Sequence, residues 1–155
     1  MDLFLAAGGG FLLAVIWMDL MFDVLALGRR VPGADGEELP EEALVQIAGY
    51  YRRVTTTASP MNMLISAVMA GMVVVLALQL VHGEGAIPIT AISLALCCVP
   101  IALALTRVFP SAIRLGSRRD DAGEQSRLAR SICIDHLLCF AAMLSFLIVR
   151  LYPRA

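Results

Sequence analysis

The sequence predicts an all-α integral membrane protein, an antiparallel bundle of four transmembrane helices with an interfacial amphipathic helix in the first connection. Its composition is 59% hydrophobic and 16% charged, with a mean hydropathy of +0.81, which is far more apolar than a soluble domain. A helix needs about 20 residues to cross a hydrocarbon core about 30 Å thick. Four apolar stretches of one domain (1–155) have this length, at about 3–27, 61–82, 87–109 and 131–151.

Runs of this length are typical of helices rather than of barrel strands, because barrel strands have about ten residues and alternate apolar with polar positions. The first span has the position of a signal peptide. However, it begins with Asp2 instead of a basic region, and it carries Asp19 and Asp23 within its apolar part. We therefore expect this span to be retained as a transmembrane helix.

Two local patterns mark the first span and the connection after it. Gly8, Gly9 and Gly10 provide a small-residue surface for close contact with another helix. After a turn-rich acidic stretch, Pro40 is placed to begin an amphipathic helix at about 41–57. We expect that helix to lie on the membrane interface, with Tyr50 and Tyr51 at the level of the headgroups. Its apolar positions recur at spacings of three and four: Leu44, Ile47, Tyr51 and Val54.

The later spans also carry signals for their ends and for a bend. Ser59 and Pro60 fit the N-cap and the first turn of the second span. Pro100 lies inside the third span, where it predicts a kink and a backbone carbonyl without its helical partner. Asp121, with Glu124 three residues later, resembles a capping box that begins the last helix before the membrane.

The positive charges predict the orientation. All 12 basic residues are Arg, and all except Arg150 and Arg154 lie in or beside the first and third connections. By the positive-inside rule that side is cytoplasmic, which puts both termini and the turn at 82–88 on the non-cytoplasmic side. We expect the membrane to be a bacterial inner membrane. The net charge of −1 indicates no nucleic-acid partner.

All four cysteines, which are Cys97, Cys98, Cys133 and Cys139, fall within the spans. They have neither the CxxC spacing nor the Cys/His spacing of a metal site, so we expect buried apolar side chains. A disulfide or a thiol relay between the third and fourth spans is the alternative.

Four ionisable side chains lie inside the predicted spans and away from the last three residues at either end: Asp19 and Asp23 in the first span, Asp135 and His136 in the last. A carboxylate in hydrocarbon costs several kcal/mol unless it is paired, protonated or facing a polar cavity, so such residues indicate a functional site. With a rise of about 1.5 Å per residue, all four lie about 6–12 Å inside the cytoplasmic boundary. Asp19 and Asp23 share one helix face, whereas Asp135 and His136 point about 100° apart.

We therefore predict a polar intramembrane pocket that opens toward the cytoplasm. Asp19 and Asp23 are the candidate base or cation site, Asp135 and His136 the candidates for proton transfer or ligation. Arg107, at the end of the third span, is the candidate for charge compensation. Carboxylates and His are suitable ligands for iron, manganese or zinc, but the Glu-x-x-His signature of di-iron bundles is absent. The sequence assigns neither a metal nor a cofactor.

The competing interpretation is a non-catalytic accessory or scaffold subunit. In it, Arg107 or Arg130 neutralises Asp23 or Asp135, and the polar residues hold helices together. Asp19 fits this interpretation least, because it is the deepest and its carboxylate neighbour raises the cost of a second charge.

Proton or ion transport is disfavoured, since the outer half of the bundle offers few relay groups. Four spans bury little surface, so we expect a homo-oligomer or a subunit of a larger membrane complex.

Two segments carry a resemblance to a known family. TRVFPSAIRL at 106–115, followed by RSICIDH at 130–136, is similar to small four-span membrane proteins of the anthrone-oxygenase-like family. The resemblance implies oxidation of a polycyclic aromatic or related lipophilic molecule at the lipid bilayer. That family usually follows the proline with a Thr-Asn-like pair, where this chain has Ser111 and Ala112 after Pro110. The similarity covers about a quarter of the chain and assigns no catalytic residue.

Overall fold

The computed structural model describes residues 1–28, 38–57 and 59–151, and the elements found in these ranges are helical. Among the described residues, four segments are long and apolar enough to cross a membrane: Asp2–Leu27, Ser59–His82, Ile87–Ser117 and Ala122–Leu151. Each predicted span falls within one of them. The third is longer than predicted, because the chain stays helical beyond 109 as far as Ser117.

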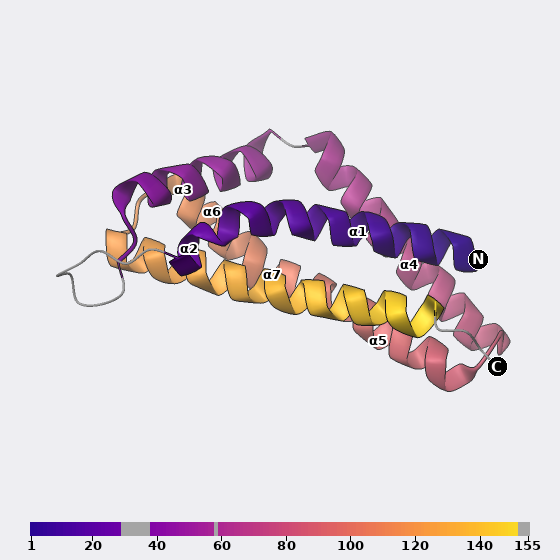
Figure 1. Ribbon diagram of the computed structural model, residues 1–155. Helices are drawn as coiled ribbons and strands as arrows, with labels where there is room; N and C mark the ends of the chain where they lie inside the picture. The colour runs from indigo at the N-terminus through magenta and orange to yellow at the C-terminus, as the bar shows by residue number, and fades with distance from the viewer. Residues whose placement is uncertain (29–37, 58, 152–155) are drawn as a thin grey trace.

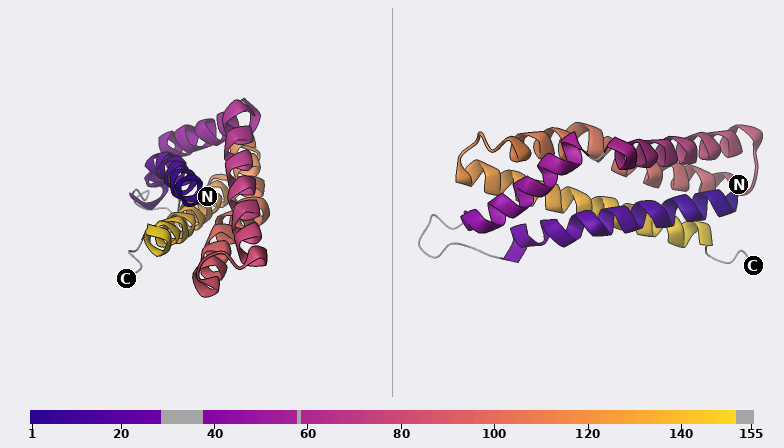
Figure 2. Two further views of the ribbon diagram at one scale, coloured as in Figure 1. Left: turned by 90° about the vertical axis from the view of Figure 1, so that its right-hand side faces the viewer. Right: turned by 90° about the horizontal axis from the view of Figure 1, so that it is seen from above.

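Figure 1 and Figure 2 show the long helices packed together, with α3 over one end. Helix α7 packs against α1 and α5, and α4 also packs against both of these helices. We call the end covered by α3 the α3 end. The elements are α1 (Asp2–Asp23), α2 (Leu25–Gly28), α3 (Glu41–Thr56), α4 (Ser59–His82), α5 (Ile87–Leu103), the π-helical turn η1 (Ala104–Val108), α6 (Phe109–Ser117) and α7 (Ala122–Leu151).

The ends and irregularities of these helices follow local sequence signals. Asp121 caps α7 as predicted, since its Oδ1 accepts a hydrogen bond of 2.8 Å from the backbone N–H of Glu124. Pro40 is the N-cap of α3, one position before the predicted first turn. Helix α5 continues through Pro100 to Leu103, and η1 begins at the next residue, Ala104. The stretch 29–37, which contains most of the predicted acidic turn, lies outside the described residues.

The predicted small-residue surface is confirmed at two of its three glycines. A Cβ at Gly8 would lie 2.8 Å from the Met72 sulfur of α4, and one at Gly9 would lie 2.8 Å from Leu147 of α7. Gly10 faces open space. Small residues at positions 8 and 9 therefore let α1 approach two different helices closely.

Helix α3 buries its apolar stripe against the protein. Leu44, Ile47 and Tyr51 are buried in an apolar cluster with Leu115 of α6 and Ile132 of α7. The amphipathic pattern is therefore confirmed, but the predicted position with this face on the membrane interface is wrong for these three residues. Their partners lie mainly in α6, which the sequence places in a connection.

Helix α3 approaches α6 closely at Gly116. A Cβ at this position would lie 3.0 Å from the backbone nitrogen and 3.1 Å from the Cα of Arg52. Because helix backbone cannot move aside cheaply, we expect Gly116→Ala to lower the free energy of unfolding by about 1–3 kcal/mol. Thermal unfolding of the purified protein in detergent micelles measures this.

Gly49→Ala in α3 is the matched control for Gly116→Ala. No atom lies within 4 Å of the Cβ position at Gly49, and Ala is the better helix former by about 0.5–1 kcal/mol. The control variant should therefore unfold at the same or a higher temperature. Equal destabilisation by both substitutions would contradict the close packing of α3 on α6.

Two apolar clusters fill the interior, and a polar layer lies between them along the helices. The first cluster, at the α3 end, includes Ala26 of α2 and Ile132 of α7. The second, in the middle and outer part of the long helices, includes Leu12 of α1 and Met143 of α7. Asp19 and Asp23 lie between Leu12 and Ala26 in the sequence, and Asp135 and His136 lie between Ile132 and Met143. The candidate site is therefore enclosed by apolar packing on both sides.

Candidate functional site

Five polar side chains meet between the two apolar clusters, and we call them the polar cluster: Asp19 and Asp23 of α1, Tyr50 and Tyr51 of α3, and His136 of α7. Three of the five were predicted site residues. The cluster joins three helices that are distant in the sequence, so it forms only when α3 packs on the α1 and α7 pair.

Asp23 is the centre of the polar cluster. It is fully buried, and its Oδ1 accepts a hydrogen bond from the Tyr51 hydroxyl. Its Oδ2 lies 2.6 Å from Nδ1 of His136, which is also buried. Both carboxylate oxygens are therefore bonded, and the second bond fixes the orientation of the imidazole ring.

Asp19 lies one turn earlier on α1 and has its own partner from α3. The Tyr50 hydroxyl donates to Asp19 Oδ1. The Tyr50 ring stacks on Phe22, with ring centroids 4.2 Å apart and an interplanar angle of 11°. This stacking holds the phenol over the carboxylate, so the geometry of Asp19 depends on the position of α3.

The two tyrosines are members of the polar cluster that sequence reasoning missed. Burial raises the pKa of both Tyr50 and Tyr51, and the carboxylates of Asp19 and Asp23 raise it further. Both phenols therefore stay protonated at neutral pH and act as donors. The sequence carried one signal for Tyr51, which continues the stripe of Leu44 and Ile47, but that stripe does not tell whether lipid or protein covers the side chain.

Asp135 points away from the polar cluster. Arg107 Nε lies 3.1 Å from its Oδ2, and Asp135 is 1% exposed whereas Arg107 is 54% exposed. Among the described residues, neither Asp135 oxygen accepts a hydrogen bond. The prediction that Asp135 and His136 point in different directions agrees with this arrangement. The expected convergence of all the acidic groups on one recess, however, is wrong for Asp135.

An apolar cavity of about 120 Å³ opens beside the polar cluster. Its walls come from α1, α4, α5, η1 and α7, and include Leu12, Met69 and Met143. Asp19 and His136 also line it. A cavity of about 150 Å³ holds benzene, so this cavity of about 120 Å³ encloses no more than one ring, and the rest of a larger lipophilic molecule would extend out of its opening.

The two polar groups at the cavity have complementary abilities. Because Nδ1 of His136 is bonded to Asp23, the other ring nitrogen, Nε2, is the one left for a molecule in the cavity. Asp19 uses Oδ1 for Tyr50, which leaves Oδ2. An imidazole held by a carboxylate and a second carboxyl group together form a pair that can donate and accept protons.

The described residues do not form a metal site. No group of three or more His, Cys, Asp or Glu side chains in the described ranges is arranged to hold an ion. Of the four predicted ligands, Asp135 faces Arg107, and both oxygens of Asp23 are bonded to protein donors. The donor set therefore favours proton transfer over ligation at the polar cluster.

One cysteine, Cys139, lines the apolar cavity together with Asp19 and His136. Cys97, Cys133 and Cys139 are buried and free, as expected for apolar filling. Cys98 is exposed, so the expectation of burial is wrong at that position. Adjacent residues on a helix point about 100° apart, and only one of this pair faces the interior.

Comparisons with known proteins found no match to a protein-family model, to a curated protein or to a solved structure. A functional assignment therefore rests on the chemistry of the site itself.

Proposed function

We propose that this chain is an integral membrane protein that binds a lipophilic molecule in the cavity beside Asp19 and His136 and catalyses proton transfer on it. The observation that carries the proposal is the buried Asp23–His136 pair, whose ring lines an apolar cavity together with a second carboxyl group. Apolar walls with a few convergent polar groups are typical of small-molecule sites.

The proposed membrane arrangement is an antiparallel four-helix bundle. Four described helices have the required length and hydropathy, and the distribution of Arg supports a cytoplasmic α3 end. Both termini are then on the non-cytoplasmic side of what we propose is a bacterial inner membrane. A lipophilic substrate would enter from the bilayer, since the cavity lies among the proposed spans.

The proposed chemistry is enolisation of a ring ketone or a similar weakly acidic group. When Asp19 and His136 share one proton, Asp19, Asp23 and His136 together have a formal charge of −1. Either position of that proton leaves one acid and one base at the cavity. The base removes a proton from a carbon next to the carbonyl, and the acid donates to the carbonyl oxygen.

The resemblance in the sequence suggests a more specific reaction. Anthrone loses a proton from its central ring, and the resulting carbanion reacts with molecular oxygen to give anthraquinone and water. In this version the polar cluster supplies the deprotonation and oxygen is the oxidant. Oxygen uptake in the presence of anthrone separates this oxidation from proton transfer alone.

His136→Gln tests the proposed function. Gln retains an N–H for Asp23 but cannot take part in acid/base transfer, so we expect the rate to fall at least tenfold. The assay follows hydrogen–deuterium exchange at the acidic carbon of 2-tetralone, without oxygen, with the protein in lipid nanodiscs. His82→Gln is the matched control, because His82 is exposed and bonds Leu78 at the opposite end. Exchange no faster than in empty nanodiscs would reject the proposal.

A second candidate is the accessory or scaffold subunit, and the Arg107–Asp135 pair favours it. That pair joins η1 to α7 with a charge contact and lines neither the cavity at Asp19 and His136 nor the pocket at Arg150. Under this alternative the polar cluster would hold helices together in the same way. Variants of the cluster would then change stability and leave 2-tetralone exchange at background.

A further inference from the structure

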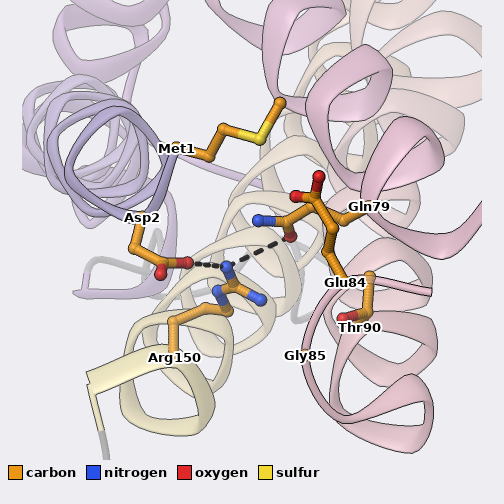
Figure 3. Close-up of a pocket in the computed structure, with 7 residues that line it drawn as sticks. All are labelled: Met1, Asp2, Gln79, Glu84, Gly85, Thr90 and Arg150. Carbon is orange, nitrogen blue, oxygen red and sulfur yellow. Dashed lines mark hydrogen bonds and ion pairs between the residues drawn. The ribbon is translucent and has the colours of Figure 1, made fainter. Parts of the chain in front are cut away.

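A second pocket lies at the end of the bundle opposite the α3 end, between α1, α4, α5 and α7. It has a volume of about 270 Å³, and Figure 3 shows its lining side chains. Its polar residues are Asp2, Gln79, Glu84, Thr90 and Arg150. Asp2 is 21 residues from Asp23 along α1, which corresponds to about 30 Å, so this pocket is separate from the polar cluster.

Three buried polar side chains of this pocket have unused hydrogen-bonding groups. The Arg150 side chain is 4% exposed, and its Nη2 donates to Asp2 and, at 3.3 Å, to Gln79 Oε1. A guanidinium has five N–H donors, so most of them are left over. Within the described residues, the Gln79 amide nitrogen and the Thr90 hydroxyl make no hydrogen bond to protein. Both groups are accessible from the pocket, where a ligand with acceptor oxygens would bond them.

The charges around the pocket select for a ligand of mixed charge. Arg150 is the basic side chain among those lining the pocket, and the α-amino group of Met1 adds a second positive charge, against the carboxylates of Asp2 and Glu84. A purely anionic ligand would be repelled by the two acids, and a purely cationic one by the guanidinium. A ligand with anionic oxygens for Arg150 and Thr90, and an ammonium group for Glu84, matches both signs.

We infer that this pocket binds a zwitterionic phosphoethanolamine group. The phosphate lies against Arg150, Gln79 and Thr90, and the ammonium group lies against Glu84. The volume suits a small group of this kind, since pockets for drug-sized ligands begin at about 300 Å³. In the proposed membrane arrangement the pocket lies at the ends of the helices, where lipid headgroups are found. The source is either a phosphatidylethanolamine headgroup or free phosphoethanolamine.

Delipidated protein in detergent tests the inference, with bound lipid counted by native mass spectrometry. We expect short-chain phosphatidylethanolamine to bind at least tenfold more tightly than phosphatidylglycerol or phosphatidylcholine of the same chain length. Equal affinity for the three lipids would overturn the inference. Competition by free phosphoethanolamine identifies the group alone as the ligand, and failure to compete identifies the lipid.

Two variants that leave Arg150 in place locate the binding. Glu84→Gln should abolish the preference for ethanolamine over glycerol headgroups, because it removes the partner of the ammonium group. Thr90→Val should weaken binding of phosphatidylethanolamine several-fold by removing a hydroxyl at nearly constant volume. Glu42→Gln, an exposed site on α3, is the matched control. An unchanged preference in Glu84→Gln would overturn the inference. Neither variant touches the polar cluster, so 2-tetralone exchange is independent of both.

Discussion

Asp23→Ala is expected to lower the free energy of unfolding by about 3–5 kcal/mol, because it removes the shared acceptor of a buried network. The substitution leaves the Tyr51 hydroxyl and the His136 imidazole without their partner. It also frees α3 from one of its polar contacts with α1. Chemical denaturation of the purified protein in micelles measures the loss, and limited proteolysis shows whether α3 is released first.

Tyr51→Phe separates the network from simple loss of volume. It deletes one donor and retains the ring, so we expect a smaller cost, about 1–2 kcal/mol. The double variant Asp23→Ala with Tyr51→Phe should cost less than the sum of the two single changes, because the substitutions share one bond. Additive costs, or a cost below about 1 kcal/mol for Asp23→Ala, would show that Asp23 does not organise the cluster.

Asp19→Asn is expected to reduce 2-tetralone exchange by at least a hundredfold while the protein stays folded. A positioned acid or base accelerates a reaction by about 10²–10⁴-fold. The amide of Asn can neither remove nor donate a proton in this way. Asn keeps an oxygen that accepts from Tyr50, so the free energy of unfolding should change by no more than about 1 kcal/mol. Exchange rate and unfolding midpoint are measured on the same preparation.

Asp135→Asn is the matched control for Asp19→Asn, since it makes the same change at a similar depth on α7. Asp135 faces Arg107 and does not line the cavity, so exchange per folded molecule should be unchanged. Loss of folding in Asp19→Asn, with 2-tetralone exchange at background in both the variant and the unchanged protein, would instead support the scaffold interpretation.

The helices could be predicted from the sequence because their signals are local. Apolar runs of sufficient length, the Asp121 cap and the stripe of Leu44 and Ile47 each depend on residues within a few turns. The similar depth of Asp23 and His136 also follows from helical rise alone. The site could be predicted only in part: Asp19, Asp23 and His136 meet, whereas Asp135 and Arg107 form a separate pair.

The sequence by itself determined the four long apolar helices, the amphipathic helix α3 and how deep each ionisable group lies along its helix, but not that the chain stays helical through α6. Only the tertiary structure decided which way each group faces and what covers it. An apolar stripe is buried equally well by lipid or by protein, so the sequence does not tell that α3 packs on α6 and brings Tyr50 and Tyr51 to the carboxylates. The rotation of each helix is set by side-chain packing between helices distant in the chain, and that packing turns Asp135 toward Arg107 and His136 toward Asp23.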